Sequence, residues 1–159
     1  MQPFRFHSIY QPRIWGGQSM RTMLGRELPD RETAYGEAWE ISDRPEAMSI
    51  AKDGEWEGMP LHRLWEEHRQ EIFGPGYERF PRFPLLCKIL DARENLSVQV
   101  HPPERTAAAR QGEVKNEIWY VLHASPDALI YGGMEENATL PDIRHAAETG
   151  QMEQLIRST

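Results

Sequence analysis

Leu96-Ser97-Val98-Gln99-Val100-His101 carries the clearest strand pattern of this chain, because apolar and polar residues alternate through it without interruption. A period of two places the apolar residues on one face of a β-strand and the polar residues on the other. Pro102 follows directly, favours extended geometry at His101 and ends the strand. The pattern predicts a strand over 96–101 with one buried and one polar face.

Three further segments have the composition of strands. An apolar run over 83–90, interrupted by Lys88, is long enough for one buried strand. Aromatic and β-branched residues dominate 116–123, and a shorter run of similar composition covers 128–131. The expected fold is therefore mainly β, a sandwich or barrel with helices at its flanks.

Helices are expected in three places along the chain. Between Pro60 and Gly74, apolar residues recur at spacings of three and four, which predicts an amphipathic helix over 60–73. The tail over 139–157 has the pattern of two short helices separated at Gly150. A short helix is also expected over 104–111, closed by Gly112.

Size and charge limit the classes of function. The chain has 159 residues, which suits one domain, and its net charge of −7 argues against nucleic acid and anionic membrane surfaces as partners. No apolar run approaches the roughly 18 residues of a membrane span, and the N-terminus lacks the pattern of a secretory signal. The one cysteine, Cys87, favours a reducing compartment, so a cytoplasmic protein is expected.

The polar face of the 96–101 strand could bind a metal ion. Gln99 and His101 would lie roughly 6.5 to 7 Å apart on one strand face, and Glu117 could join them from a neighbouring strand. An imidazole, an amide oxygen and a carboxylate suit Zn²⁺ or a Mn²⁺-like ion. The alternative is that these side chains form the solvated side of a half-open sheet.

Lys88 is the one charge within its apolar run. A buried lysine is costly unless it is paired or used, so this residue could face an anionic ligand. The alternative is that Lys88 lies at a strand edge and extends its ammonium group to water.

Five stretches together resemble the N-terminal half of the type I phosphomannose isomerases, over nearly the whole chain from about Phe4 to about Arg157. They are Ile14-Trp-Gly-Gly17, Gly36-Glu-Ala-Trp-Glu-Ile-Ser42, Phe83-Pro-Leu-Leu-Cys-Lys-Ile-Leu-Asp91, Leu96-Ser-Val-Gln-Val-His-Pro102 and Lys115-Asn-Glu-Ile-Trp-Tyr-Val121. The Ser-Val-Gln-Val-His-Pro segment with the later Lys-x-Glu is the specific part of this resemblance, whereas Trp-Gly-Gly alone is weak.

The resemblance implies a cupin-type β-barrel enzyme that interconverts mannose 6-phosphate and fructose 6-phosphate with one bound zinc ion. It implies Gln99, His101 and Glu117 as zinc ligands. It therefore favours a metal site over a solvated strand face as the role of these side chains. Ser97, Lys88 and Lys115 match positions that contact the sugar phosphate. No general base is assigned, because Glu117 is taken as a ligand.

This sequence departs from the family pattern in its second half. The family's fourth ligand, a histidine, and its catalytic arginine are expected beyond Thr159, so residues 1–159 are interpreted as a single, incomplete cupin-type portion with helical insertions around 60–73 and 139–157. The alternative to an active isomerase is a truncated, non-catalytic fragment that binds metal or sugar phosphate weakly. Open strand edges would then favour self-association.

Overall fold

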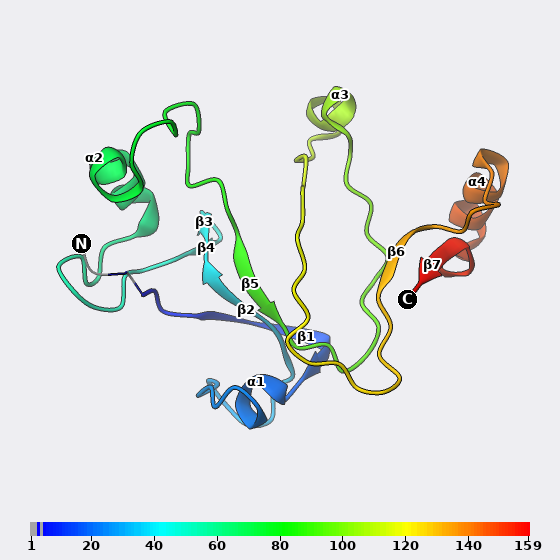
Figure 1. Cartoon of the computed structure of the whole chain (residues 1–159), viewed down its shortest axis with the longest axis horizontal. Coiled ribbons are helices and arrows are strands. Elements are labelled where there is room, and N and C mark those ends of the chain that lie inside the picture. The colour runs from blue at the N-terminus through cyan, green and yellow to red at the C-terminus, as the bar shows by residue number, and fades with distance from the viewer. Residues whose placement is uncertain (1–2, 4) are drawn as a thin grey trace. The chain divides into compact units, whose positions relative to one another are not determined.

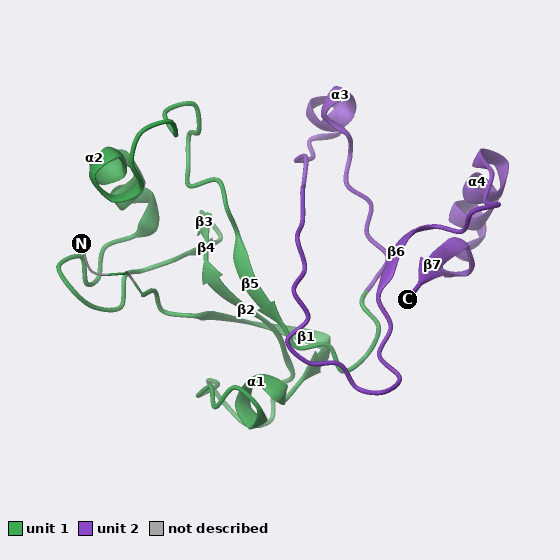
Figure 2. Cartoon of the chain, viewed as in Figure 1, with its two compact units in different colours: residues 1–96 green, residues 97–159 purple. Residues whose placement is uncertain are grey.

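The chain divides into two compact units, Met1–Leu96 and Ser97–Thr159, which are coloured separately in Figure 2. The computed structural model describes Pro3 and residues 5–159, so Phe4, where the family resemblance begins, lies outside the described residues.

Unit 1 is built on a three-stranded antiparallel sheet of β1 (Ile9–Gly17), β2 (Tyr35–Ile41) and β5 (Cys87–Leu90), in the order β1-β2-β5 (Figure 1). The strand predicted over 83–90 is thus only half as long. Phe83 donates its backbone N–H to the Asp43 carboxylate at 2.7 Å, and its ring packs against Trp65. Aromatic packing therefore takes the first part of this apolar run out of the sheet.

One face of the sheet carries the core of unit 1. Tyr10, Ala38 and Ile89 are cross-strand neighbours on the three strands. With Tyr35 they pack around Met20, which α1 (Ser19–Thr22) supplies and which is almost fully buried. Removing these apolar side chains from water stabilises the sheet on this side and leaves the opposite face for polar groups.

The Trp-Gly-Gly segment forms the last three residues of β1, where the register with β2 is irregular. A Cβ on Gly16 would lie 2.6 Å from the backbone nitrogen of Gly36, so only glycine permits this approach of two strands. Asp91 holds this end of β1 in place: its backbone accepts from Gly17 and donates to Gly36, and its carboxylate accepts from the Met20 N–H at 2.8 Å.

The amphipathic helix predicted from Pro60 is confirmed as α2 (Leu61–Phe73), and it ends at Gly74, where φ is 80°. Its buried residues include Trp65, whose ring contacts Phe73, Tyr77 and Phe83 and whose indole N–H donates to the Phe80 carbonyl. A small hairpin of β3 (Asp43–Arg44) and β4 (Ala47–Met48) completes the regular structure of unit 1.

Unit 2 has shorter elements, most of them stabilised locally. The predicted helix over 104–111 is found as α3 (Glu104–Ala107) with the 3₁₀ turn η1 (Ala108–Arg110), and the Gly112 N–H closes it on the Ala107 carbonyl. Near the end of the chain lie β6 (Tyr131–Met134), α4 (Leu140–Thr149), η2 (Met152–Leu155) and β7 (Ile156–Ser158).

The prediction of two helices in the tail is correct only for the first. Helix α4 begins with a capping box between Thr139 and Asp142 and ends at Gly150, which is left-handed. The second segment forms only the turn η2 and then β7, which pairs with β6. Ile156 lies opposite Met134, so strand pairing overrides the helical pattern there.

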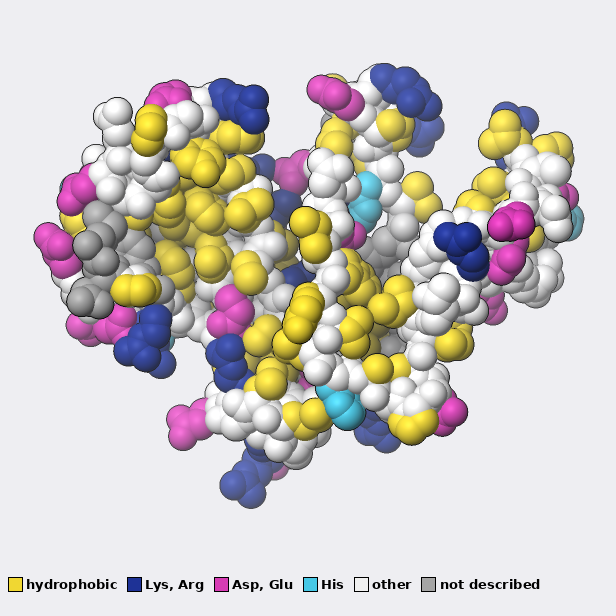
Figure 3. Space-filling model, viewed as in Figure 1, with side chains coloured by type: hydrophobic (Ala, Val, Ile, Leu, Met, Phe, Trp, Pro, Cys, Tyr) yellow, Lys and Arg dark blue, Asp and Glu magenta, His cyan; other side chains and the backbone are white. Residues whose placement is uncertain are grey.

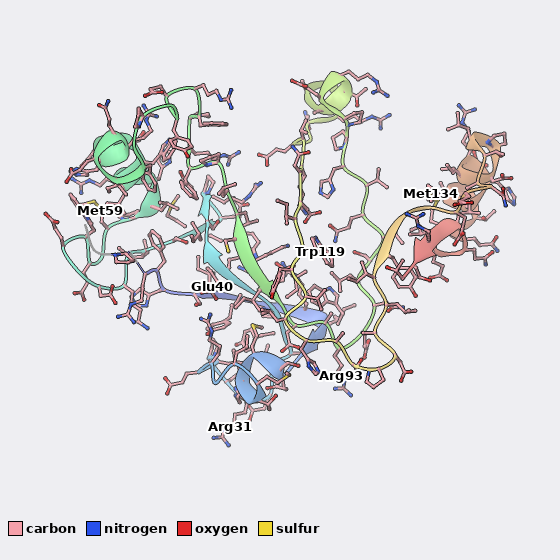
Figure 4. All side chains as sticks on the ribbon, viewed as in Figure 1. Arg31, Glu40, Met59, Arg93, Trp119 and Met134 are labelled. Carbon is pink, nitrogen blue, oxygen red and sulfur yellow. The ribbon has the colours of Figure 1, made fainter. Side chains whose placement is uncertain are left out.

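Two strands predicted in unit 2 do not form. Residues 96–101 and 116–123 have no regular structure, and β6 begins only at Tyr131, the last residue of the third predicted strand. A strand needs a hydrogen-bonded neighbour, and these stretches have none among the described residues. Their apolar side chains consequently lie in water: Ile118 is 99% exposed, and Trp119, labelled in Figure 4, is 56% exposed.

The described strands form open sheets, and none closes into a barrel, in agreement with the incomplete β architecture predicted from the sequence. Apolar side chains are visible on the molecular surface in Figure 3. No helix in the described part of the chain is both long and apolar enough to cross a membrane.

Candidate functional site

Lys88 lies on β5, opposite Trp39 of β2, on the face of the sheet away from the Met20 core. Its ammonium nitrogen is 3.6 Å from the Oε1 atom of Glu37, and its side chain is 22% exposed. Strand β5 is an edge strand of its sheet, as one interpretation of Lys88 required. The lysine is nevertheless paired with a carboxylate that is itself only 9% exposed, so it does not simply extend into water.

Glu37 connects several polar groups on this face. Its carboxylate accepts from the indole N–H of Trp39 at 2.6 Å and from the Nε and Nη2 atoms of Arg13, each at 3.3 Å. Burial alone would raise the pKa of the Glu37 carboxyl, but the Trp39 hydrogen bond and the charges of Lys88 and Arg13 lower it below its ordinary value. Glu37 is therefore a fixed negative charge.

Neither Glu37 nor Arg13 was predicted from the sequence as a member of a site. The alternation Glu37-Ala38-Trp39 could have indicated that Glu37 and Trp39 share a strand face. The pairing with Lys88 depends on the register between β2 and β5, which connects residues about fifty positions apart. Local sequence patterns carry no information on that register.

The predicted metal ligands lie in unit 2, on the two stretches that lead into and out of α3. These stretches approach each other at the base of α3, where a Cβ added to Gly112 would lie 2.7 Å from the ring of Pro102. His101 immediately precedes this contact and Lys115 follows it by three residues. The loop thus holds Pro102 close to Gly112, although neither flanking stretch is in a strand.

Within the predicted set, the structure forms two contacts. The amide nitrogen of Gln99 donates to the Ser97 hydroxyl at 3.4 Å. The Lys115 ammonium group and the Glu117 carboxylate form an ion pair at 3.0 Å. All of these side chains, and that of His101, are exposed. No contact joins His101 to Gln99 or to Glu117 among the described residues.

The chemistry of these donors fits a zinc ion. Gln99, His101 and Glu117 supply an amide oxygen, an imidazole nitrogen and a carboxylate, which are oxygen and nitrogen donors of the kinds that Zn²⁺ accepts. No cluster of three His, Cys, Asp or Glu side chains suited to a metal is found in the described part of the chain. The predicted set includes only two such residues, because its third donor is an amide.

Comparison with protein families places most of this chain in one of them. Residues 3–127 match the model of the phosphomannose isomerase type I catalytic domain. Across 157 residues the chain is 40% identical to a mannose-6-phosphate isomerase of Streptococcus mutans, and across 160 residues it is 38% identical to mannose-6-phosphate isomerase ManA of Bacillus subtilis. Each alignment covers 98% of this chain and 48% of the relative.

The fold has a solved counterpart as well. The crystal structure of the mannose 6-phosphate isomerase from Bacillus subtilis matches this chain with a TM-score of 0.84 and 32% identity, over 100% of this chain and 49% of the other. This likeness confirms the mainly β, cupin-like fold class predicted from the sequence. The chain spans about half the length of the curated relatives that it matches.

Proposed function

We propose, on the premise that this chain belongs to the type I phosphomannose isomerases, that it carries the first part of the site that interconverts mannose 6-phosphate and fructose 6-phosphate. One observation carries the proposal: 98% of the chain aligns with a protein named mannose-6-phosphate isomerase at 40% identity. The proposal extends to a cytoplasmic protein, since a single cysteine suits a reducing compartment.

Zinc is the proposed cofactor, and Gln99, His101 and Glu117 are its proposed ligands. When bound, zinc would polarise sugar oxygens and stabilise the negative charge that develops as a proton moves between C1 and C2. Glu117 would then act as a ligand while remaining close to the Lys115 ammonium group, which is 3.0 Å away. That ion pair would fix the direction of the carboxylate.

The proposed substrate contacts are Ser97, Lys88 and Lys115. Each lysine carries three N–H donors, which suits it to the phosphate and to hydroxyl groups of a sugar phosphate. Ser97, whose hydroxyl accepts from Gln99, can still donate its own hydrogen to the substrate. These groups bind and orient the sugar phosphate, and the general base remains unassigned among them.

The zinc content of the purified chain tests this proposal. We expect about one zinc ion per chain by elemental analysis, and its loss when Gln99, His101 and Glu117 are all replaced by alanine. A matched control replaces Gln154, His123 and Glu136, which are the same residue types at exposed positions of unit 2. Equal zinc content in the two triple variants would rule out this ligand set. A coupled isomerase assay on the zinc-bound chain then measures turnover.

A second candidate is a non-catalytic cupin-type fragment that binds metal or sugar phosphate weakly. It corresponds to a site that binds the ligand without a general base, since none is assigned among the described residues. Zinc or sugar-phosphate binding without turnover in the coupled assay would support this candidate over the active isomerase.

The proposal also includes self-association through strand edges. Strands β1 and β5 are the edge strands of their sheet, and several apolar residues of unit 2 are exposed. Analytical ultracentrifugation should therefore detect dimers or larger species, whose fraction rises with concentration. A monomer at high concentration would contradict this expectation.

A further inference from the structure

Two cations share one carboxylate on the polar face of the β1-β2-β5 sheet. Arg13 of β1 contacts both oxygens of Glu37, and Lys88 of β5 approaches the same carboxylate from the other neighbouring strand. The side chains of Arg13 and Lys88 are 34% and 22% exposed. The three groups together carry one excess positive charge.

This local excess of positive charge contrasts with the net charge of the whole chain, which is −7. Withdrawing a charge from water is costly unless an opposite charge compensates for it. Glu37 compensates for one of the two cations, and its lowered pKa keeps it ionised. The second cation has no further carboxylate partner among the described residues, so the arrangement can accommodate a second anion.

The hydrogen-bonding capacity of Arg13 supports the same conclusion. Its Nε and Nη2 atoms each donate to Glu37, and Nη1 donates to the Pro12 carbonyl at 3.0 Å. A guanidinium group has five N–H bonds, so one remains on each terminal nitrogen within the described surroundings. A pair of terminal N–H bonds suits two oxygens of one phosphate group. The Lys88 ammonium group has unused donors as well, since its approach to Glu37 is longer than a hydrogen bond.

The geometry points to Arg13 as a second cation, together with Lys88, of a phosphate-binding site on this face of the sheet. The inference rests on the proposed function only in taking the anion to be the phosphate of a sugar phosphate. Arg13 would contact the ligand directly, and Glu37 would remain the internal counter-ion between the two cations.

Titration of the intact chain with inorganic phosphate at low ionic strength, followed by calorimetry, tests the inference. We expect Arg13→Gln to weaken binding by about tenfold or more, the usual effect of losing a charge-assisted contact. Lys88→Met should have a similar effect. Arg5→Gln is the matched control, because Arg5 carries the same charge, is ion-paired with Asp53 and lies on the surface. Its effect should stay within about twofold.

Arg13→Lys separates the loss of charge from the loss of folded structure. This variant keeps the positive charge but not the fork of two N–H donors, so its affinity should lie between those of the wild type and Arg13→Gln. Thermal unfolding of each variant identifies any that fail to fold. Equal phosphate affinities for Arg13→Gln, Arg13→Lys and Arg5→Gln in folded proteins would overturn the inference.

Mannose 6-phosphate and unphosphorylated mannose distinguish the sources of the anion. If mannose 6-phosphate competes with inorganic phosphate and mannose does not, the phosphate group is the part recognised. Zinc content in the same samples separates this inference from the proposed function. A chain that holds zinc but binds no phosphate would overturn the inference alone, whereas Arg13-dependent phosphate binding without zinc would support it and contradict the metal site.

Discussion

Units 1 and 2 contain similar apolar residue types but use them differently. In unit 1, Leu61, Leu64 and Trp65 are almost completely buried, and so is Met20 beneath the sheet. Among the described residues of unit 2, the buried apolar residues are Ala107 and Ala146, and larger side chains such as Ile118 lie in water. A strand-like sequence therefore becomes a strand only where a partner accepts its hydrogen bonds and covers its apolar face.

Replacing one tryptophan in each unit is the strongest test of that comparison. Trp65→Ala removes a ring that is 1% exposed and packed against Phe73, Tyr77 and Phe83, so it should lower the free energy of unfolding of unit 1 by about 3–5 kcal/mol. Trp119→Ala, at a position 56% exposed, should change stability by no more than about 0.5 kcal/mol. Urea unfolding followed by circular dichroism measures both. Similar losses in the free energy of unfolding for the two variants would show that the two tryptophans do not differ in their contribution to stability.

Glycine substitutions extend the test to the backbone. A Cβ on Gly36 would lie 2.6 Å from both the Arg13 Cβ and the Trp15 ring, so Gly36→Ala should cost about 1–3 kcal/mol. Gly132 of β6 has open space around the same position, and Gly132→Ala should be close to neutral. The same urea experiment applies. A neutral Gly36→Ala variant would mean that β1 and β2 are less tightly packed than the structure indicates.

Local stability in unit 2 depends on helix capping. The Thr139 hydroxyl accepts from the Asp142 backbone N–H at the start of α4, so Thr139→Ala should destabilise this helix by about 1 kcal/mol. Hydrogen exchange of the α4 amides measures the effect. Thr139→Ser retains the hydroxyl and should exchange like the wild type. Equally fast exchange in both variants would indicate that the cap does not stabilise α4.

Acid should weaken unit 1 through Glu37. The folded-state pKa of Glu37 lies below its ordinary value, so its contribution to stability is complete above the unfolded-state pKa, about 4.3 for glutamate, and is lost as the pH falls through the folded-state pKa. Glu37→Gln should therefore lose less stability than the wild type between about pH 5 and pH 3. Unfolding measured across this range checks the slope.

Asp142 provides the corresponding test in unit 2. Hydrogen bonds from Thr139 lower the pKa of its carboxyl, so acid should weaken the cap of α4 in the same direction. Asp142→Asn should make hydrogen exchange in α4 less dependent on pH without altering the acid response of unit 1. A changed acid response in unit 1 would show that the two effects are not local.

The sequence allowed the local elements to be predicted better than the pairings between them. Helix α2 and the turn at Gly112 follow from apolar spacing and from glycine positions, which act over a few residues. The strands expected over 96–101 and 116–123 have the right residue types but no described partner. Strand propensity reflects burial and pairing more than the backbone itself, so sequence alone could not decide their outcome.

The candidate site also combines residues that the sequence indicates with residues that only strand pairing brings together. The position of Lys88 within an apolar run predicts either an anionic ligand or an ammonium group that extends to water, whereas in the structure Lys88 is paired with Glu37. Neither Glu37 nor Arg13 was identified beforehand, because cross-strand register brings them together. The metal ligands Gln99, His101 and Glu117 remain predictions, based on their residue types and on a family resemblance.

The contacts of Asp91 limit the order in which this protein can fold during synthesis. Its carboxylate accepts from the Met20 N–H, and its backbone forms hydrogen bonds with Gly17 and Gly36. The positions of these residues near the start of unit 1 therefore depend on a residue near its end. Contacts between such distant positions form slowly, since the intervening chain must close into a loop. A nascent chain that has not yet emerged from the ribosome to Asp91 therefore lacks the contacts that hold the end of β1 to Met20 and Gly36.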